Sequence, residues 1–172
     1  RPSIEERPEI VEKRQRLGDW EGDTILGKGR RHLLVTLTDR KSRLTRVYKV
    51  VRKTAQEVAA AVIDMLRLWK DRVHTITSDN GKEFAHFERI GEALKAMMDF
   101  AHPYASWERG TNKNTNGLIR QYFPKDKDLS AITREEIVWV EQRLNNRPRK
   151  CLGFKTPNGV FFNTYSPVAL DS

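Results

Sequence analysis

Three consecutive segments decide the fold: WEGDTILG (20–27), RHLLVTLTD (31–39) and SRLTRVYKVV (42–51). The second and third are rich in Val, Leu and Thr, residue types that suit a pleated, half-buried surface. Arg40 and Lys41 separate these two segments, and Ser42 can support a turn there. Strand-like runs joined by short turns pair with their neighbours, so the segments predict a three-stranded antiparallel meander.

Helix and strand signals alternate after the meander. TAQE (54–57) is a capping box, and the apolar residues after it repeat with helical spacing. VHTITS (73–78) and MMDFAH (97–102) predict a fourth and a fifth strand. The stretch between them predicts a helix over 84–95, with its apolar residues facing inward.

The last third of the chain predicts helices. The spacing in NTNGLIRQYF (114–123) suits a helix despite Gly117, and TREE (133–136) is a second capping box. Pro157 fits the first turn of a final helix. Strands first and helix–strand units afterwards indicate an α/β fold. We expect a five-stranded mixed sheet, the meander plus two further strands, with helices packed on both faces.

Length and composition fit one basic domain. The chain has 172 residues, a formal net charge of +9 and a pI of about 9.8, which favours a polyanionic partner over an acidic one. A solvated basic surface is the alternative. The single Cys151 excludes an internal disulfide and Cys-rich metal sites, as expected in a reducing cytoplasm. The sequence shows no membrane-length apolar run and no signal peptide, so no membrane association is expected.

The first residues differ from the rest in composition. RPSIEERPEIVEKRQRLG (1–18) is polar and mixed in charge, and it predicts an entry segment or a short helix outside the core. Residues 19–172 would then form the folded domain. The chain does not begin with Met, so we expect upstream material to be missing.

Two aspartates stand out as candidates for chemistry. Asp23 lies inside a strand-like segment, where Asp is disfavoured, although an exposed edge position would explain it. Asp79 ends the fourth strand and precedes Asn80-Gly81, which is also ordinary turn chemistry. If the two strands lie side by side, the carboxylates meet and repel unless a cation lies between them. Mg²⁺ or Mn²⁺ is the cation that such oxygen ligands prefer.

Several motifs together resemble a known family. WEGDTILGKGRRHLLVTLTDRKSRLTRVYKV, ITSDNGKEF, HPYASWERGTNKNTNGLIRQYFPK and LNNRPRKCLGFKTPNGVF occur in the same order and spacing as in the catalytic domain of the insertion-sequence-thirty family of bacterial transposases. That family belongs to the DDE superfamily, which has the RNase H-like fold of retroviral integrases. The resemblance covers about residues 17–162. It implies that Asp23 and Asp79 are the first two acids of the catalytic triad.

The third position departs from the family pattern. The family has Glu in the motif GTNENTNG, whereas this chain has GTNKNTNG (110–117), so Lys113 occupies the place of the catalytic Glu. There are 33 residues between Asp79 and Lys113, close to the family spacing. A lysine brings a positive charge in place of a carboxylate, and its ammonium could itself act as a tethered counter-ion. We therefore expect a normally folded chain with lost or impaired activity. Glu83 and Glu108 are expected not to compensate as ligands.

Further candidates are expected at a DNA interface, although caps, solvated faces and a packed indole are the structural alternatives. Asn80 and Gly81 would shape the metal-site turn, and His102 would line the active-site loop. The DNA-contact candidates are basic, amide or aromatic side chains: Lys28, Arg30, Arg31, Trp107, Asn112, Asn114, Asn116, Arg147, Arg149 and Lys150.

The resemblance also implies a reaction. Members cut transposon ends and transfer the freed 3′-OH to target DNA, with two Mg²⁺ or Mn²⁺ ions and without a nucleotide cofactor. It implies DNA ends and target DNA as partners, a homo-oligomer on DNA, and a place at the bacterial nucleoid. The N-terminal helix-turn-helix region of the family is absent from this chain.

Two alternatives to this function stay open. Another RNase H-like nuclease would share the aspartate pair but would not explain the GTNxNTNG and NNRPRKCLG motifs. A non-catalytic DNA-binding or oligomerisation module derived from a transposase would explain Lys113.

Overall fold

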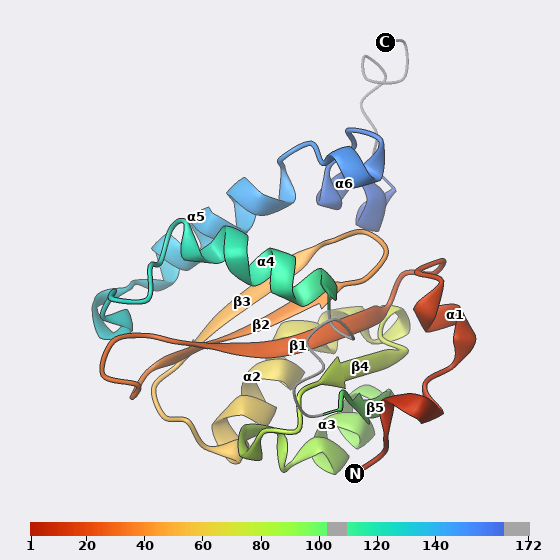
Figure 1. The fold of residues 1–172 in the computed structure, drawn as a ribbon, viewed down its shortest axis with the longest axis horizontal. Helices are drawn as coiled ribbons and strands as arrows, with labels where there is room; N and C mark the ends of the chain where they lie inside the picture. The colour runs from red at the N-terminus through yellow and green to blue at the C-terminus, as the bar shows by residue number, and fades with distance from the viewer. Residues whose placement is uncertain (103–109, 164–172) are drawn as a thin grey trace.

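The computed structural model describes residues 1–102 and 110–163, and a five-stranded sheet with the order β3-β2-β1-β4-β5 forms its centre (Figure 1). β1 (Asp19–Leu26), β2 (Leu33–Asp39) and β3 (Thr45–Val50) pair antiparallel. β4 (Thr75–Ser78) and β5 (Met97–Phe100) extend the sheet parallel to β1. The expected mixed sheet, with its meander and two further strands, is confirmed.

The helices begin where local sequence signals place them. Thr54 caps α2, because its hydroxyl accepts a hydrogen bond from the Glu57 amide, and Thr133 caps α5 in the same way. Pro157 is in the first turn of α6. The α-helices are α1 (Glu9–Glu12), α2 (Ala55–Leu66), α3 (Phe87–Leu94), α4 (Gly110–Arg120), α5 (Arg134–Asn145) and α6 (Pro157–Phe162). Short 3₁₀ helices are η1 (Ile4–Glu6), η2 (Arg67–Arg72), η3 (Lys82–Phe84), η5 (Leu129–Ala131) and η6 (Lys150–Leu152).

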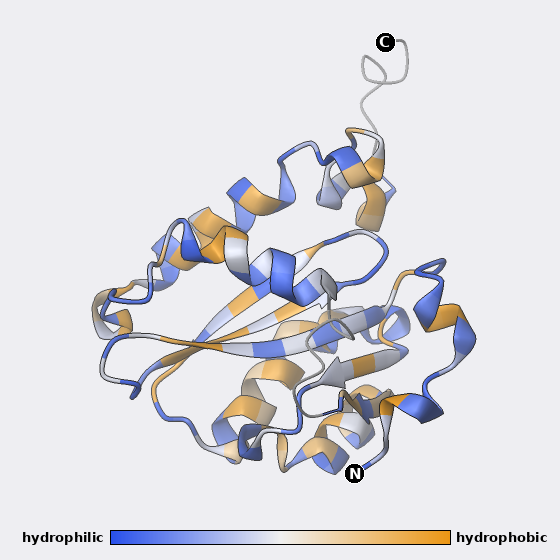
Figure 2. Ribbon diagram, viewed as in Figure 1, coloured by the Kyte–Doolittle hydropathy of each residue, from blue (hydrophilic) through white to orange (hydrophobic). Residues whose placement is uncertain are grey.

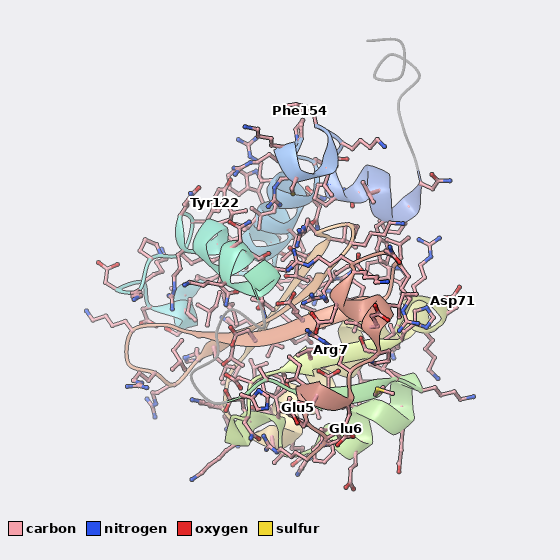
Figure 3. All side chains as sticks on the ribbon, turned by 45° about the vertical axis from the view of Figure 1, so that its right-hand side comes forward. Glu5, Glu6, Arg7, Asp71, Tyr122 and Phe154 are labelled. Carbon is pink, nitrogen blue, oxygen red and sulfur yellow. The ribbon has the colours of Figure 1, made fainter. Side chains whose placement is uncertain are left out.

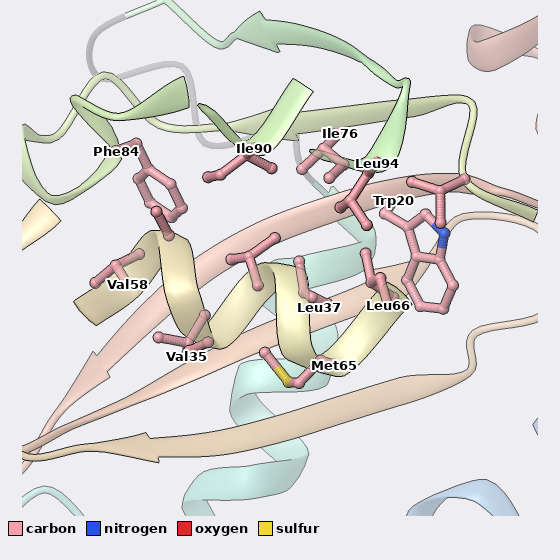
Figure 4. Packing of buried hydrophobic residues seen from close by; sticks show 14 of the residues in the cluster. Trp20, Val35, Leu37, Val58, Met65, Leu66, Ile76, Phe84, Ile90 and Leu94 are labelled. Atoms are coloured by element: carbon pink, nitrogen blue, oxygen red, sulfur yellow. The ribbon is translucent and has the colours of Figure 1, made fainter. Parts of the chain in front are cut away.

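Helices cover both faces of the sheet, as expected. On one face, α2 and α3 bury a large apolar cluster that includes Trp20, Leu37 and Met65, shown in Figure 4. On the other face, α4 and α5 bury a smaller cluster around Ile25 and Ile119. Figure 2 shows that the first half of α4 is hydrophilic, whereas its last turns carry hydrophobic residues. None of the helices in the described ranges is long and apolar enough to cross a membrane.

The expectation that residues 1–18 stay outside the core is wrong in two places. Val11 is fully buried and Ile4 is 8% exposed. Ser3 forms a parallel bridge with Phe100, so the segment runs along the free edge of β5. Arg7, labelled in Figure 3, donates a hydrogen bond to the Thr77 hydroxyl of β4 at 3.2 Å. The polar composition predicted an exposed segment. A few apolar and arginine side chains are nevertheless enough to anchor a short segment on a polar sheet face.

Two helix boundaries also differ from expectation. The helix predicted over 84–95 begins at Phe87, because Phe84 belongs to the preceding 3₁₀ turn, and it ends where Lys95 takes a left-handed conformation with φ 52°. The helix predicted over 114–123 begins earlier, at Gly110, so the whole GTNKNTNG motif is helical. Its polar residues concealed the helix because they face both the interior and the solvent.

Candidate active site

Asp23 lies on β1, on the sheet face that α4 covers. Side chains alternate along a strand, and Ile25 of β1 belongs to the cluster beneath α4 and α5, so Glu21 and Asp23 point to the same side. The Oδ1 atom of Asp23 accepts a hydrogen bond from the Thr24 amide at 2.8 Å. An aspartate at this half-buried strand position thus lies beneath the helix that carries the third motif.

Asp79 directly follows β4, the parallel neighbour of β1. The register pairs Asp19 with Thr75 and Glu21 with Thr77. The pairing of β1 with β4 ends at Glu21 and Thr77, and Asp79 follows the end of β4. If the same register continued, residue 79 would lie across from Asp23. The meeting of the two aspartates therefore stays a prediction, with the parallel pairing of β1 and β4 in its favour.

Gly81 allows the turn after Asp79 to close tightly. Its amide donates a hydrogen bond to Asp79 Oδ1 at 3.0 Å. A Cβ atom at residue 81 would lie 2.9 Å from that same oxygen and 2.5 Å from Glu83 Oε2. A side chain at residue 81 would require the carboxylate groups of Glu83 and Asp79 to move. The role of Gly81 in shaping a metal-site turn stays a prediction.

Asn116 on α4 connects the helix to Asp23. Its Nδ2 atom donates a hydrogen bond to Asp23 Oδ2 at 2.9 Å, and its Oδ1 atom accepts one from the Thr36 hydroxyl at 3.2 Å. Thr36 is the cross-strand partner of Asp23 in the β1–β2 register. Asn116 was expected to touch DNA or to cap the helix. In the structure its side chain instead orients a carboxylate of the site.

Lys113 is exposed in the first turns of α4. It precedes Asn116 by three residues, and residues three apart on an α-helix share one side. Lys113 thus lies on the side of α4 that carries the Asp23 contact. Its place at the third catalytic position stays a prediction.

Asn112 does not have the surface that a DNA contact requires. The residue is fully buried. Its backbone amide donates a hydrogen bond to Glu21 Oε1 at 3.1 Å, and its side-chain Oδ1 atom accepts one from the Thr36 hydroxyl at 3.3 Å. Within the described residues its Nδ2 atom has no hydrogen-bond partner. The prediction that this side chain contacts DNA is therefore wrong. Asn112 is buried against the sheet, because the first turn of α4 packs directly on it.

A buried ion pair beside the site escaped the sequence analysis. Arg40 is 3% exposed, and its Nη1 atom donates to Glu21 Oε2 at 2.8 Å while its Nε atom donates to the Val11 carbonyl at 3.1 Å. Glu21 is fully buried. The available signal was the two-residue spacing of Glu21 and Asp23, which puts both acids on one face of β1.

Glu83, which was expected not to be a metal ligand, lies near Asp79 and contacts Thr24, the residue after Asp23. It is 9% exposed, and its Oε1 atom accepts a hydrogen bond from the Thr24 hydroxyl at 3.1 Å. Its other oxygen and Asp79 Oδ1 both border Gly81. Thr24 points to the opposite face of β1 from Asp23, so Glu83 approaches the site from the α2 side.

The carboxylates fit a hard divalent cation only in part. Asp23 and Asp79 supply oxygen donors from adjacent strands, which suits Mg²⁺ or Mn²⁺. Across residues 1–102 and 110–163, no three His, Cys, Asp or Glu side chains form a group that could hold a metal ion. The third family position supplies an ammonium, which is not a metal ligand.

The other predicted DNA contacts occupy different surroundings. Lys28, Arg30 and Arg31 are exposed in the β1–β2 connection, and Asn114 and Lys150 are exposed elsewhere. Arg147 donates a hydrogen bond to the Tyr122 hydroxyl at 3.3 Å. Arg149 is half-buried. Trp107 and Glu108 lie outside the described residues. His102 is within 3.5 Å of Glu5, at the N-terminal segment. For the exposed basic residues, DNA contact stays a prediction.

Solved structures with this fold come from retroviral integration. An intasome of simian T-cell lymphotropic virus in complex with PP2A regulatory subunit B56 gamma superposes with a TM-score of 0.67 at 21% identity, over 88% of this chain and 55% of that chain. The catalytic core domain of BIV integrase gives a TM-score of 0.64 at 18% identity, over 85% of this chain and 94% of that chain. These superpositions confirm the RNase H-like fold.

Sequence relatives are bacterial transposases. The transposase for insertion sequence element IS4351 of Bacteroides fragilis is 52% identical over 94% of this chain and 49% of its own length. The transposase InsI for insertion sequence element IS30A of Escherichia coli (strain K12) is 42% identical over 91% of this chain and 41% of its own length. This chain spans less than half the length of either relative, and the resemblance found in the motifs is confirmed. The family model described as integrase core domain matches residues 13–106, and the chain belongs to the integrase core domain family.

Proposed function

We propose that this chain is the catalytic core of a DNA transposase, with residues 19–172 as the catalytic domain of a longer protein. One observation carries the proposal: β1, which carries Asp23 beneath α4, pairs in parallel with β4, the strand that Asp79 follows. Relatives named as transposases support it. The substrates would be transposon ends and target DNA, and the chain would act as a homo-oligomer at the bacterial nucleoid.

Asp23 and Asp79 would hold a divalent metal ion, Mg²⁺ or Mn²⁺, through their carboxylate oxygens. When bound, two such ions would polarise the scissile phosphate and activate the attacking oxygen. The chain's own groups perform the positioning. Asn116 fixes one oxygen of Asp23, the Gly81 amide fixes one oxygen of Asp79, and Thr36 orients Asn116. Such fixed geometry is what phosphoryl transfer requires of a protein.

We further propose that Lys113 impairs catalysis. It lies on the side of α4 that contacts Asp23, where its ammonium competes electrostatically with a cation held by the two aspartates. A carboxylate at the same position would add a third oxygen ligand. The effect on folding is expected to be small, because the side chain is exposed.

The test is cleavage of a transposon-end duplex with Mn²⁺, comparing the unaltered chain with Lys113→Glu. We expect the variant to gain at least about tenfold in rate, the size of change that a metal ligand or its close support typically produces. Asn114→Glu, which places a carboxylate at the next exposed position of α4 and changes the net charge by one unit where Lys113→Glu changes it by two, is the control and should gain nothing. Full activity in the unaltered chain would contradict the proposed impairment.

A non-catalytic DNA-binding or oligomerisation module is the second candidate, and Lys113 is the observation that favours it. Calorimetric titration with Mn²⁺ separates the two. A degenerate enzyme retains metal binding through Asp23 and Asp79, and Asp79→Asn abolishes it. A pure binding module shows no metal binding in either form.

A further inference from the structure

Three arginines from distant parts of the chain lie near one another: two contact the first turn of α4, and the third is close enough to repel one of them. We call them the arginine cluster: Arg14 after α1, Arg43 in the β2–β3 turn, and Arg149 before η6. Arg43 donates a hydrogen bond to the Thr111 hydroxyl of α4. Arg14 Nη2 lies 3.9 Å from the Cβ position of Gly110, the first residue of that helix. Figure 1 shows the β2–β3 turn between α1 and α6, at the N-terminal end of α4.

The neighbouring acids form their ion pairs with other arginines. Glu12 pairs with Arg7, and Glu21 pairs with Arg40. Within the described residues, none of the three cluster arginines forms an ion pair with a carboxylate, and the Arg14 guanidinium has no hydrogen bond. The first turn of α4 contains no acidic residue. Among the described residues, positive charge therefore predominates at the positive end of the helix dipole.

The arginines are also held close enough to repel one another. Burial lowers the pKa of Arg14, and repulsion from Arg40 and Arg43 lowers it further, against attraction from Glu21 and Glu12. Burial likewise lowers the pKa of Arg149, and Arg43 and Arg147 add repulsion, against an opposing contribution from Cys151. Half-buried, mutually repelling guanidinium groups gain free energy when an anion is bound among them. A phosphate accepts hydrogen bonds from several guanidinium groups at once.

The cluster and Asp23 are connected through α4. Thr111 contacts the cluster, and Asn116 on the same helix contacts Asp23. The helical rise between two residues five apart is about 7.5 Å. A phosphate bound at the cluster would therefore lie close to the candidate active site.

We propose that Arg14, Arg43 and Arg149 bind a backbone phosphate of duplex DNA beside the candidate active site. The proposal rests on the proposed function, since it takes DNA as the substrate. Arg14 is its most informative member. Because its guanidinium makes no hydrogen bond to the described part of the protein, replacing it removes charge without leaving a buried partner unsatisfied.

The test measures binding of a fluorescent duplex oligonucleotide by anisotropy at several salt concentrations. The slope of log affinity against log salt reports the number of phosphates neutralised. We expect Arg14→Gln and Arg149→Gln each to reduce the magnitude of this slope by about 1. Arg14→Lys, which retains the charge, should keep the slope. Arg89→Gln is the matched control, because Arg89 is exposed on α3, on the opposite face of the sheet.

The outcomes separate the two proposals. If the unaltered chain binds the duplex and Arg14→Gln has the slope of Arg89→Gln, the arginine site is wrong and the proposed function stands. If the unaltered chain shows no salt-dependent binding, both proposals fail. Thermal unfolding of each variant distinguishes a lost phosphate contact from a lost fold, and the charge-retaining Arg14→Lys variant must bind like the unaltered chain.

Discussion

The two faces of the sheet bury different kinds of side chain. Beneath α2 and α3 the buried residues are apolar, and large side chains such as Trp20, Leu37 and Phe84 interlock there. The other face has an apolar cluster only beneath α4 and α5. The rest of that face is a polar strip, defined by the residues Asp19, Glu21, Asp23, Thr75, Thr77 and Asp99.

The polar strip is buried but largely hydrogen-bonded. Thr75 donates to Asp19 at 2.8 Å, Thr77 donates to Asp99 at 2.8 Å, and Glu21 pairs with Arg40. The candidate active site lies at the end of this strip. The apolar face therefore stabilises the fold. The polar face orients the carboxylates of the candidate site, at some cost in stability.

The largest effect is expected from breaking the apolar face. Trp20 is fully buried, stacks on Trp69 with ring centroids 6.4 Å apart, and packs edge-on against Phe161. Trp20→Ala should lower the free energy of unfolding by about 3–5 kcal/mol, through lost burial and the cavity left behind. Chemical denaturation measures it, and Trp139→Ala, at a half-exposed tryptophan, is the control. An equal loss in both variants would contradict the assigned role of this face.

A pH-dependent effect is expected from the polar strip. Burial raises the pKa of Asp99 to about 6, against opposing contributions from its bond with Thr77 and from Arg7 and Arg40, while Glu12 raises it slightly. A raised carboxyl pKa means that the folded state holds the proton more tightly than the unfolded state. The contribution of Asp99 to the free energy of unfolding is then fully present below about pH 4 and is lost as the pH rises through about 6.

The variant that isolates this contribution is Asp99→Asn, which cannot titrate. Relative to the unaltered chain, its free energy of unfolding should improve by up to about 3 kcal/mol between pH 4 and pH 7, following the size of the pKa shift. Denaturant melts across this pH range provide the measurement. A difference between the two proteins that stays constant with pH would show that Asp99 has the same pKa in the folded and unfolded states, which would contradict the raised pKa.

The smallest effect on stability is expected at the site itself. Asn116→Ala removes the hydrogen bond to Asp23 and one partner of Thr36. It should cost about 1 kcal/mol of stability. In the Lys113→Glu background it should also slow strand cleavage, since Asp23 loses its orientation. Asn114→Ala, at an exposed position of the same helix, should change stability by less than about 0.5 kcal/mol. Equal effects from the two asparagines would contradict the positioning role of Asn116.

Local patterns predicted most of the fold. Strand alternation, two capping boxes and Pro157 predicted the elements, because each depends on residues within a few positions of one another. Residues 1–18 were misjudged, since their burial depends on the edge of β5 far away in the chain. The predicted helix began at residue 114, whereas α4 begins at Gly110. The sequence does not distinguish the buried Asn112 from the exposed Asn114, so the first turn was missed.

The candidate site divides in the same way. By itself the sequence determined which candidate residue types are present: the aspartates at 23 and 79, and the lysine at 113 where the related motif has a glutamate. Only the tertiary structure decided that Asn116 orients Asp23, that Arg40 neutralises Glu21, and that distant arginines meet at α4. The reason is physical. A motif specifies which groups are present, whereas the partner of a polar side chain is set by the element that packs over it and excludes water.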